Sequence, residues 1–198
     1  MPAAEGGDTM EKGIVIFSHG KESTPAGAKI SALAEVARER GFAAESLDFA
    51  DLPNPDGRVQ RLVERCVREK RPLVLAGSSM GGYVATVASN AVKPVGLFLM
   101  APAFYLSGYA EQSPVPRAQK TVIVHGWNDD VIPAEHSVRF AGRHRAELFL
   151  VDGDHFLSSQ LPFLVELFGL FLDRLNDSPR YSLGVVRALH RGHRAAGM

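Results

Sequence analysis

Short apolar runs alternate with helical patterns along most of the chain, and this alternation limits the possible folds more than any other feature. The runs typical of strands cover residues 13–18, 43–49, 72–76, 94–100, 121–124 and 146–151, and the helical patterns cover 25–40, 59–67, 81–91, 134–142 and 161–175. In the helical segments the apolar residues recur every three to four positions. Repeated strand–helix units favour a parallel sheet with helices on both faces, because right-handed crossovers place successive helices there. We therefore predict an α/β fold, a three-layer α/β/α sandwich with a mostly parallel sheet of about six strands.

The length and composition fit one globular domain. The chain has 198 residues, of which 45% are hydrophobic and 22% are charged, close to the averages for soluble domains. We expect residues 13–176 to form this domain, residues 1–12 a flexible N-terminus and residues 177–198 a basic C-terminal tail. The tail is interpreted as a frayed or loosely docked terminus, with a basic contact element as the alternative.

The charge balance and the apolar patterning exclude several classes of protein. Lys and Arg (22 residues) equal Asp and Glu (22 residues) in number, so the chain lacks the basic character of a nucleic-acid binder. No apolar run approaches the roughly 20 residues of a membrane span, and the N-terminus does not resemble a signal peptide. The single cysteine, Cys66, cannot form an internal disulfide. We expect a cytoplasmic protein, a monomer or small homo-oligomer, that binds neither nucleic acid nor a membrane.

Motifs for cofactors and metals fail on inspection. The segment Gly20–Ser23 differs from a phosphate-binding loop, because Glu22 stands where Ser or Thr should follow the lysine. No G-x-G-x-x-G follows any predicted strand, so dinucleotide binding is unsupported. His190 and His193 have a helical metal-ligand spacing, but two ligands without a third make no site. We expect neither a cofactor nor a metal.

One motif indicates chemistry. Residues 77–81 form a G-x-S-x-G pattern centred on Ser79, with a predicted strand before it and a predicted helix after it. In a nucleophile elbow the serine occupies a sharp, strained turn, and the flanking positions have no room for side chains. Gly77 and Gly81 meet this requirement. The alternative is an ordinary glycine-rich turn between a strand and a helix.

A serine hydroxyl is a poor nucleophile and needs a base that is held by an acid. Two loops downstream of Ser79 carry such groups, and each follows a predicted strand. The first contains Asp129 and Asp130, either of which could be the acid, and the second contains His155. Both loops lie at the carboxyl ends of strands, where open α/β sheets bind ligands.

Four sequence blocks together resemble the α/β-hydrolase superfamily. They are His19-Gly20, Gly77–Gly81, the loop His125-Gly126-x-x-Asp129-x-x-Ile132-Pro133, and Gly153-Asp154-His155. The resemblance spans about residues 13 to 175 and is greatest to the small, cap-less, dienelactone-hydrolase-like group.

The resemblance implies a role for each of five residues. Ser79 would be the nucleophile, Asp129 the orienting acid, and His155 the general base and then the general acid. The family spacing from His125 favours Asp129 over Asp130. The backbone N–H groups of Met80 and Lys21 would form the oxyanion hole.

The substrate is constrained by the segment between the fourth and fifth predicted strands. It spans only residues 101–120, too few for the helical cap that larger family members insert there, so we expect a shallow, open site. Aromatic residues on loops at this edge, Phe104, Tyr105, Trp127 and Phe156, are candidates to line an acyl pocket, the alternative being that they pack on their neighbours.

The expected function is a serine hydrolase that cleaves small carboxylic esters or thioesters through an acyl-enzyme. A thioesterase, a peptidase or a C–C bond hydrolase would use the same triad. An alternative from a different class is a catalytically silent binding module with the hydrolase fold.

Overall fold

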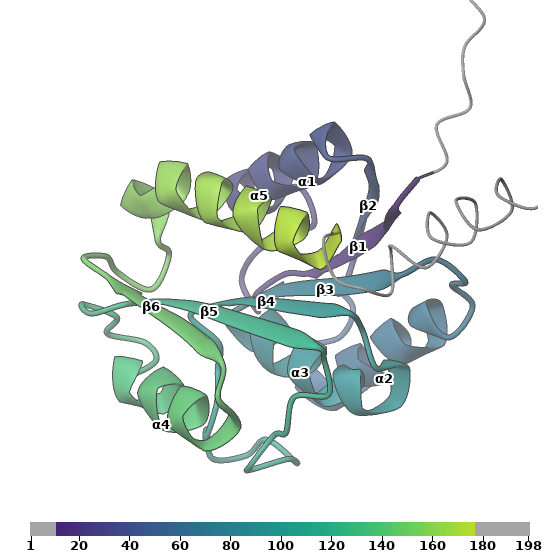
Figure 1. Cartoon of the computed structure of the whole chain (residues 1–198). Helices are drawn as coiled ribbons and strands as arrows, with labels where there is room; N and C mark the ends of the chain where they lie inside the picture. Colours follow the sequence, from purple (N-terminus) through teal and green to yellow (C-terminus); the bar gives the residue numbers. More distant parts are fainter. Residues whose placement is uncertain (1–10, 177–198) are drawn as a thin grey trace, which may run out of the picture.

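The computed structural model describes residues 11–176 as one parallel sheet covered by helices on both faces (Figure 1). The strands are β1 (Gly13–Ser18), β2 (Phe42–Leu47), β3 (Leu73–Ser78), β4 (Gly96–Met100), β5 (Lys120–Gly126) and β6 (Glu147–Val151). The helices are α1 (Ala28–Glu39), α2 (Pro55–Cys66), α3 (Met80–Val92), α4 (Ala134–His144) and α5 (Leu161–Asn176), with a 3-10 turn, η1 (Ser158–Gln160), before α5. The strand order is β2-β1-β3-β4-β5-β6, and all five neighbouring pairs are parallel.

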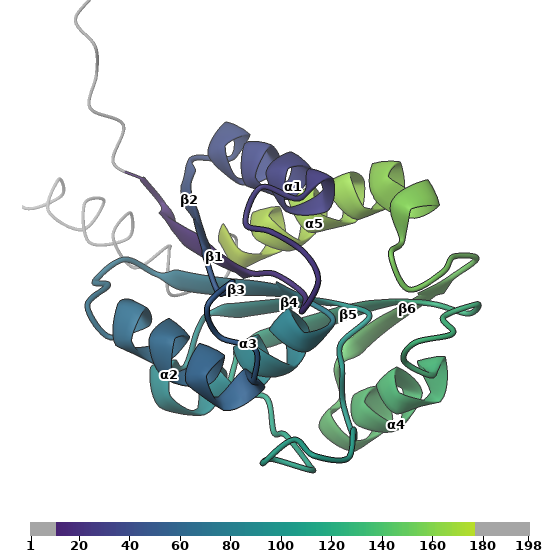
Figure 2. The same cartoon turned by 180° about the vertical axis from the view of Figure 1, so that it is seen from behind.

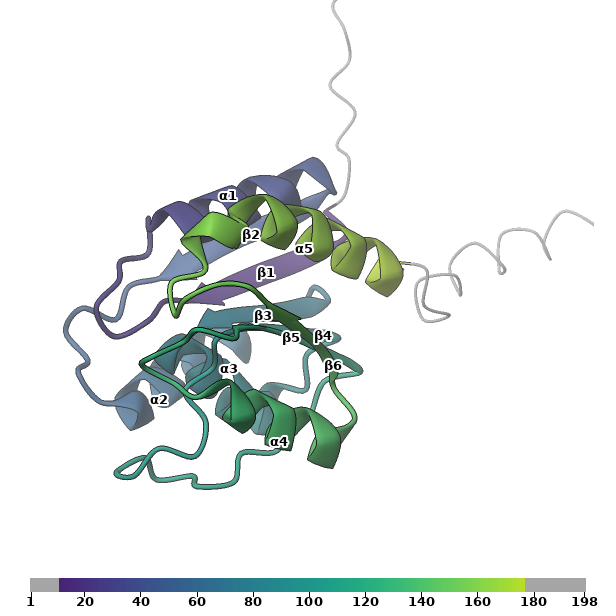
Figure 3. The same ribbon diagram turned by 90° about the vertical axis from the view of Figure 1, so that its left-hand side faces the viewer.

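Two hydrophobic cores lie on opposite faces of the sheet. Helices α1 and α5 cover one face, and α2, α3 and α4 cover the other (Figures 1 and 3). Strand β1 contributes to both cores, because successive side chains of a strand point to opposite faces. Val15 and Phe17 belong to the core under α1 and α5, whereas Ile14 and Ile16 belong to the other. This two-sided burial explains why β1 is continuously apolar.

The predicted fold class is therefore confirmed, and the structure adds detail at two places. The sheet is entirely parallel, and no helix connects β4 to β5. The connection, residues 101–119, instead runs as a loop on the side of the sheet covered by α3 and α4 (Figures 1 and 2). Backbone hydrogen bonds attach this connection to the sheet; for example, the Ala101 amide donates to the carbonyl of Val124 at 2.8 Å.

The expected terminal segments fall mostly outside the described residues. Residues 1–10 of the predicted N-terminal segment, and the whole predicted basic tail from 177 to 198 with its His190 and His193, lie outside residues 11–176. Lys12 already belongs to the domain, since its amide donates to the carbonyl of Gly41 at 2.8 Å. Among residues 11–176, no helix has the length and apolar character needed to cross a bilayer.

The sheet brings four loops to one edge. Ser18 at the end of β1 pairs with Gly77 of β3, and Ser78 pairs with Met100 of β4. On the other side, Gly126 at the end of β5 pairs with Val151 at the end of β6. The carboxyl ends of parallel strands lie at the same edge, so the loops that follow β1, β3, β5 and β6 meet there.

Candidate active site

Ser79 occupies a strained turn between β3 and α3. Its backbone has φ 55° and ψ −121°, a left-handed conformation that is rare for a residue other than glycine. The turn is held by its own peptide groups: the Ser79 amide donates to the carbonyl of Met100 at 2.9 Å, and its carbonyl accepts from the amides of Gly82 and Ala103 at 2.9 and 3.0 Å. The strain is therefore maintained by the surrounding structure, as expected of a functional turn.

The flanking glycines are required by close backbone contacts. A Cβ atom on Gly77 would lie 2.2 Å from the Gly81 carbonyl oxygen, and one on Gly81 would lie 1.9 Å from the Ser18 carbonyl oxygen. Both distances are far below van der Waals contact, and the opposing atoms are backbone that cannot rotate away. The G-x-S-x-G pattern thus follows from the packing of β1, β3 and α3.

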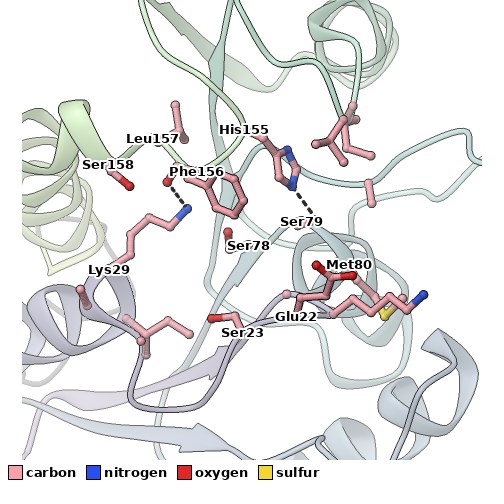
Figure 4. A pocket seen from close by; sticks show the side chains of 18 of the residues that line it. Glu22, Ser23, Lys29, Ser78, Ser79, Met80, His155, Phe156, Leu157 and Ser158 are labelled. Carbon is pink, nitrogen blue, oxygen red and sulfur yellow. Dashed lines mark hydrogen bonds between the residues drawn. The ribbon is translucent and has the colours of Figure 1, made fainter.

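Three side chains from three loops form a hydrogen-bonded relay. The Nε2 atom of His155 lies 3.0 Å from the Oγ atom of Ser79, and its Nδ1 atom lies 2.7 Å from Oδ2 of Asp129. Figure 4 shows the imidazole of His155 directed at Ser79 at one side of the cavity. This is the geometry of a nucleophile, a base within hydrogen-bond reach, and an acid that orients the base.

Asp129 is fixed by four hydrogen bonds. Its Oδ1 atom accepts from the amides of Val131 and Ile132 at 2.9 and 2.7 Å, and its Oδ2 atom lies within reach of His155 and of His125 Nε2. Burial by itself would raise the pKa of Asp129, but the amide donors and His155 outweigh this effect and hold the pKa below its usual value. The side chain of Asp129 is fully buried, so the relay contains a buried carboxylate with its charge compensated.

The structure distinguishes Asp129 from the neighbouring acids. Asp130 is exposed, and it is Asp129 that contacts His155 and His125. Asp154 shapes the turn before η1, because its Oδ1 atom accepts from the Leu157 amide at 2.9 Å, as short acidic side chains commonly do in turns. Across residues 11–176, no group of three or more His, Cys, Asp or Glu side chains is arranged to hold a metal ion.

The loop after β1 lies against Ser79. A Cβ atom on Gly20 would be 3.5 Å from the Cβ atom of Ser79, and Gly20, Lys21 and Met80 all line the cavity beside the serine. The buried imidazole of His19 holds this loop, since Nδ1 lies 2.7 Å from the Gly20 carbonyl oxygen and Nε2 accepts from the Phe49 amide at 3.1 Å. The backbone of residues 20–21 and the start of α3 therefore face the same space.

Arg58 gives this loop a second attachment, which the sequence analysis missed. Its guanidinium is buried, and its Nη1 atom donates to the carbonyls of His19 and Gly20 at 3.3 and 3.2 Å. The Nε atom donates to the Leu52 carbonyl at 2.7 Å. A signal was present in the sequence, because Arg58 precedes the buried Leu62 by one helical turn and thus lies on the apolar stripe of α2.

A cavity of about 620 Å³ lies beside the relay (Figure 4). Its apolar lining includes Met80, Leu106, Ile132 and Leu161. The lining also includes polar groups, among them Lys29, whose ammonium group donates to the Phe156 carbonyl at 2.7 Å. The sequence analysis did not single out Lys29, because a lysine at the start of an amphipathic helix is ordinarily a solvated surface residue.

Of the four aromatic residues expected to line an acyl pocket, only Phe156 lines this cavity. Phe104 is instead fully buried and stacks on Phe140 with ring centroids 4.1 Å apart. Tyr105 lies under the guanidinium of Arg139, and Trp127 is 58% exposed on the loop after β5. The expectation is corrected for these three residues, because Phe104 and Tyr105 pack against side chains of α4 and Trp127 is largely exposed to solvent.

Comparisons with known proteins identify the family and agree with the fold. The model of an uncharacterised protein family (UPF0227) matches residues 14–113, just over half of the chain. A protein of the α/β-hydrolase superfamily from Xanthomonas campestris pv. campestris, of known structure, has 36% sequence identity to this chain. The two structures superpose with a TM-score of 0.77, and the match covers 83% of this chain and 99% of that one. The chain belongs to the α/β-hydrolase superfamily and to UPF0227.

More distant members share the α/β-hydrolase fold. Est1E from Butyrivibrio proteoclasticus, also determined with ferulic acid bound, is 18% identical, with a TM-score of 0.69 over 86% of this chain and 91% of that one. A serine hydrolase without a lid from Xanthomonas campestris is 19% identical, with a TM-score of 0.67 over 86% of both chains. The present chain has the same minimal α/β-hydrolase fold without a lid. No curated protein sequence gives a significant match.

Proposed function

We propose that this α/β-hydrolase is a serine hydrolase that cleaves small carboxylic esters or thioesters through an acyl-enzyme. The observation that carries the proposal is the relay from Ser79 Oγ through His155 to Asp129, with contacts of 3.0 and 2.7 Å. The strained backbone of Ser79 adds support, because such strain is costly and persists where the surrounding structure enforces it.

In the first half-reaction Ser79 Oγ attacks the carbonyl carbon of the substrate while His155 Nε2 takes the hydroxyl proton. The carbonyl oxygen becomes an oxyanion, which the backbone N–H groups of Met80 and Lys21 stabilise. Collapse of the tetrahedral intermediate breaks the bond to the alcohol or thiol, and His155 gives the proton to this leaving group. Asp129 holds the imidazole in the required orientation and stabilises its protonated form.

In the second half-reaction a water molecule attacks the acyl-enzyme while His155 accepts one of its protons. The tetrahedral intermediate collapses, the carboxylic acid leaves, and the proton returns to Ser79. Cys66 does not compete as a nucleophile, because burial raises the pKa of its thiol to about 12 and keeps it protonated.

The proposal is tested by the turnover of 4-nitrophenyl butyrate by the wild-type protein and by Ser79→Ala. The variant is expected to lose on the order of 10³-fold or more in kcat, because the nucleophile is absent. Ser107→Ala is the matched control, since Ser107 is exposed on the 101–119 connection. Equal turnover by Ser79→Ala and the wild type would refute the mechanism. Absence of turnover in the folded wild type with thioester and amide substrates as well would favour a silent binding module.

A further inference from the structure

The cavity beside Ser79 contains a cation that the proposed mechanism does not use. Lys29, the second residue of α1, extends toward the loop that carries His155 and Phe156 (Figure 4). Its Nζ atom donates to the backbone carbonyl of Phe156 at 2.7 Å, and both Lys29 and Phe156 line the same cavity as Ser79 and His155.

Lys29 lacks a directly paired anion within the part of the chain that the structure describes. In residues 11–176 no carboxylate lies within 4.0 Å of its ammonium group. An ammonium group has three N–H donors, and the Phe156 carbonyl uses one of them. The other two are available to a molecule that occupies the cavity.

The surroundings of the Lys29 ammonium group disfavour its charged form, so a ligand of opposite charge can stabilise it. Loss of solvent lowers the pKa of Lys29 to about 8, and the more distant carboxylates of Asp154 and Asp129 oppose this effect. Lys29 thus remains largely protonated at neutral pH. Among residues 11–176, the only hydrogen-bond partner of this ammonium group is a neutral carbonyl, so a carboxylate would stabilise it further, because opposite charges attract strongly where solvent is scarce.

The rest of the cavity fits a substrate with one anionic end. The hydroxyl-bearing side chains of Ser23 and Ser158 lie around the same space as Lys29 (Figure 4). The apolar side chains of Ile30, Leu157 and Leu161 provide contacts for a short hydrocarbon chain. The lining contains two further charged side chains, Lys21 and Glu22, and both are exposed.

We propose that Lys29 determines specificity by binding a carboxylate of the substrate, so that the preferred ester or thioester carries a second, ionised carboxyl group in its acyl or alcohol part. This inference rests on the proposed hydrolase function for its catalytic consequence. The anion site itself depends only on Lys29 and the cavity around it.

The experiment compares esters that differ in one charge. Mono-4-nitrophenyl adipate and its methyl ester place the charge on the acyl side, and 3-(butanoyloxy)benzoate and its methyl ester place it on the alcohol side. The wild type is expected to favour the charged member of at least one pair by about tenfold or more in kcat/KM. Lys29→Met should abolish this preference, so that the ratio of kcat/KM for the charged ester to that for the neutral ester falls to about one through a higher KM for the charged ester, and Lys29→Arg should retain most of the preference.

The design separates recognition from support of the Phe156 loop. A purely structural role of Lys29 would lower kcat for both members of a pair equally, and this result would overturn the inference, as would the absence of charge preference in both wild-type pairs. Arg38→Gln is the matched control, because Arg38 is an exposed cation on the same helix, and it should behave like the wild type.

Failure of the proposed function remains distinguishable from failure of the inference. If the wild type hydrolyses neither neutral ester, binding of monomethyl adipate and dimethyl adipate is measured by isothermal titration calorimetry. Binding of the monoanion that Lys29→Met abolishes would support the carboxylate site without the hydrolase activity. Absence of binding, or binding that is unchanged in Lys29→Met, would overturn the inference.

Discussion

His125 and His155 contact the same carboxylate oxygen: Oδ2 of Asp129 lies 3.0 Å from Nε2 of His125 and 2.7 Å from Nδ1 of His155. Burial lowers the pKa of His125, so its ring is neutral at neutral pH. We assign the proton to Nε2, which faces Asp129 and the Ile132 carbonyl, because Nδ1 can then accept from the Ser137 hydroxyl at 2.7 Å. His125 thus positions Asp129 without taking part in proton transfer.

Replacement of His125 is the first test of this arrangement. His125→Leu leaves Asp129 and the Ser137 hydroxyl each without one buried partner, which costs roughly 1–3 kcal/mol per group. We expect kcat for 4-nitrophenyl butyrate to fall by about tenfold or more, part of the 10²–10⁴ that general-base catalysis typically contributes. Urea unfolding measures the stability. Ser137→Ala is the control with the smaller expected effect, and unchanged kcat and stability in His125→Leu would contradict the assignment.

Two of the buried histidines, His19 and His125, also predict how stability depends on pH. Burial lowers the pKa of both His19 and His125 below the ordinary value of 6.5. The unfolded chain therefore takes up protons at these positions before the folded protein does, and the unfolded state gains stability as the pH falls below about 6.5. The free energy of unfolding should be smaller near pH 5 than near pH 7.5. Equal or greater stability near pH 5, measured by urea unfolding, would show that this linkage is absent or outweighed.

The turn around Ser79 predicts different outcomes for two glycine substitutions. A Cβ atom on Gly81 would meet the Ser18 carbonyl oxygen at 1.9 Å, whereas nothing lies within 4 Å of the corresponding position on Gly142 in α4. Gly81→Ala should lower both Tm and ester turnover, because β1 and α3 must separate. Gly142→Ala should raise stability by up to about 1 kcal/mol, since alanine is the better helix former. Thermal unfolding of Gly81→Ala at the wild-type Tm would refute the packing argument.

Arg58 provides a test of the loop after β1. In Arg58→Met the carbonyls of His19, Gly20 and Leu52 lose a buried donor, and the backbone N–H of Lys21 loses its fixed position. We expect kcat to fall by about 10²-fold, the lower range for loss of one oxyanion-hole donor. Arg58→Lys keeps the positive charge but lacks the planar guanidinium group, so its kcat should lie between those of the wild type and Arg58→Met. A wild-type kcat for folded Arg58→Met would exclude a positioning role.

The fold was predictable because its signals are local. The strand-like apolar runs and the helical periodicity are properties of contiguous segments, and they identified all six strands. The absence of a helix between β4 and β5 followed from the short connection with Pro114 and Pro116. Ser79 stood out through the G-x-S-x-G pattern, and Asp129 and His155 through their positions in loops after strands and in blocks that resemble the superfamily. The carboxyl ends of the strands of a parallel sheet meet at one edge, which brings these loops together.

The rest of the site depends on contacts between distant segments. Lys29 and Phe156 are 127 positions apart in the chain, and no local pattern relates them. Phe104 was misplaced for the same reason, because a loop aromatic can turn toward the core or toward the substrate, and Phe140 of α4 decides the outcome. Arg58 was overlooked since a charged residue on an apolar stripe is ordinarily assigned to solvent.

Activation of Ser79 can be measured without a known substrate, by the intact mass of the protein after exposure to a fluorophosphonate, followed by peptide mapping. An activated serine attacks the phosphorus and expels fluoride, so we expect one adduct on Ser79 and none on the adjacent Ser78. The wild type should be labelled, and His155→Ala should be labelled far more slowly because its base is missing. Absence of an adduct in folded wild type, or an adduct on another residue, would contradict the claim that Ser79 is an activated nucleophile.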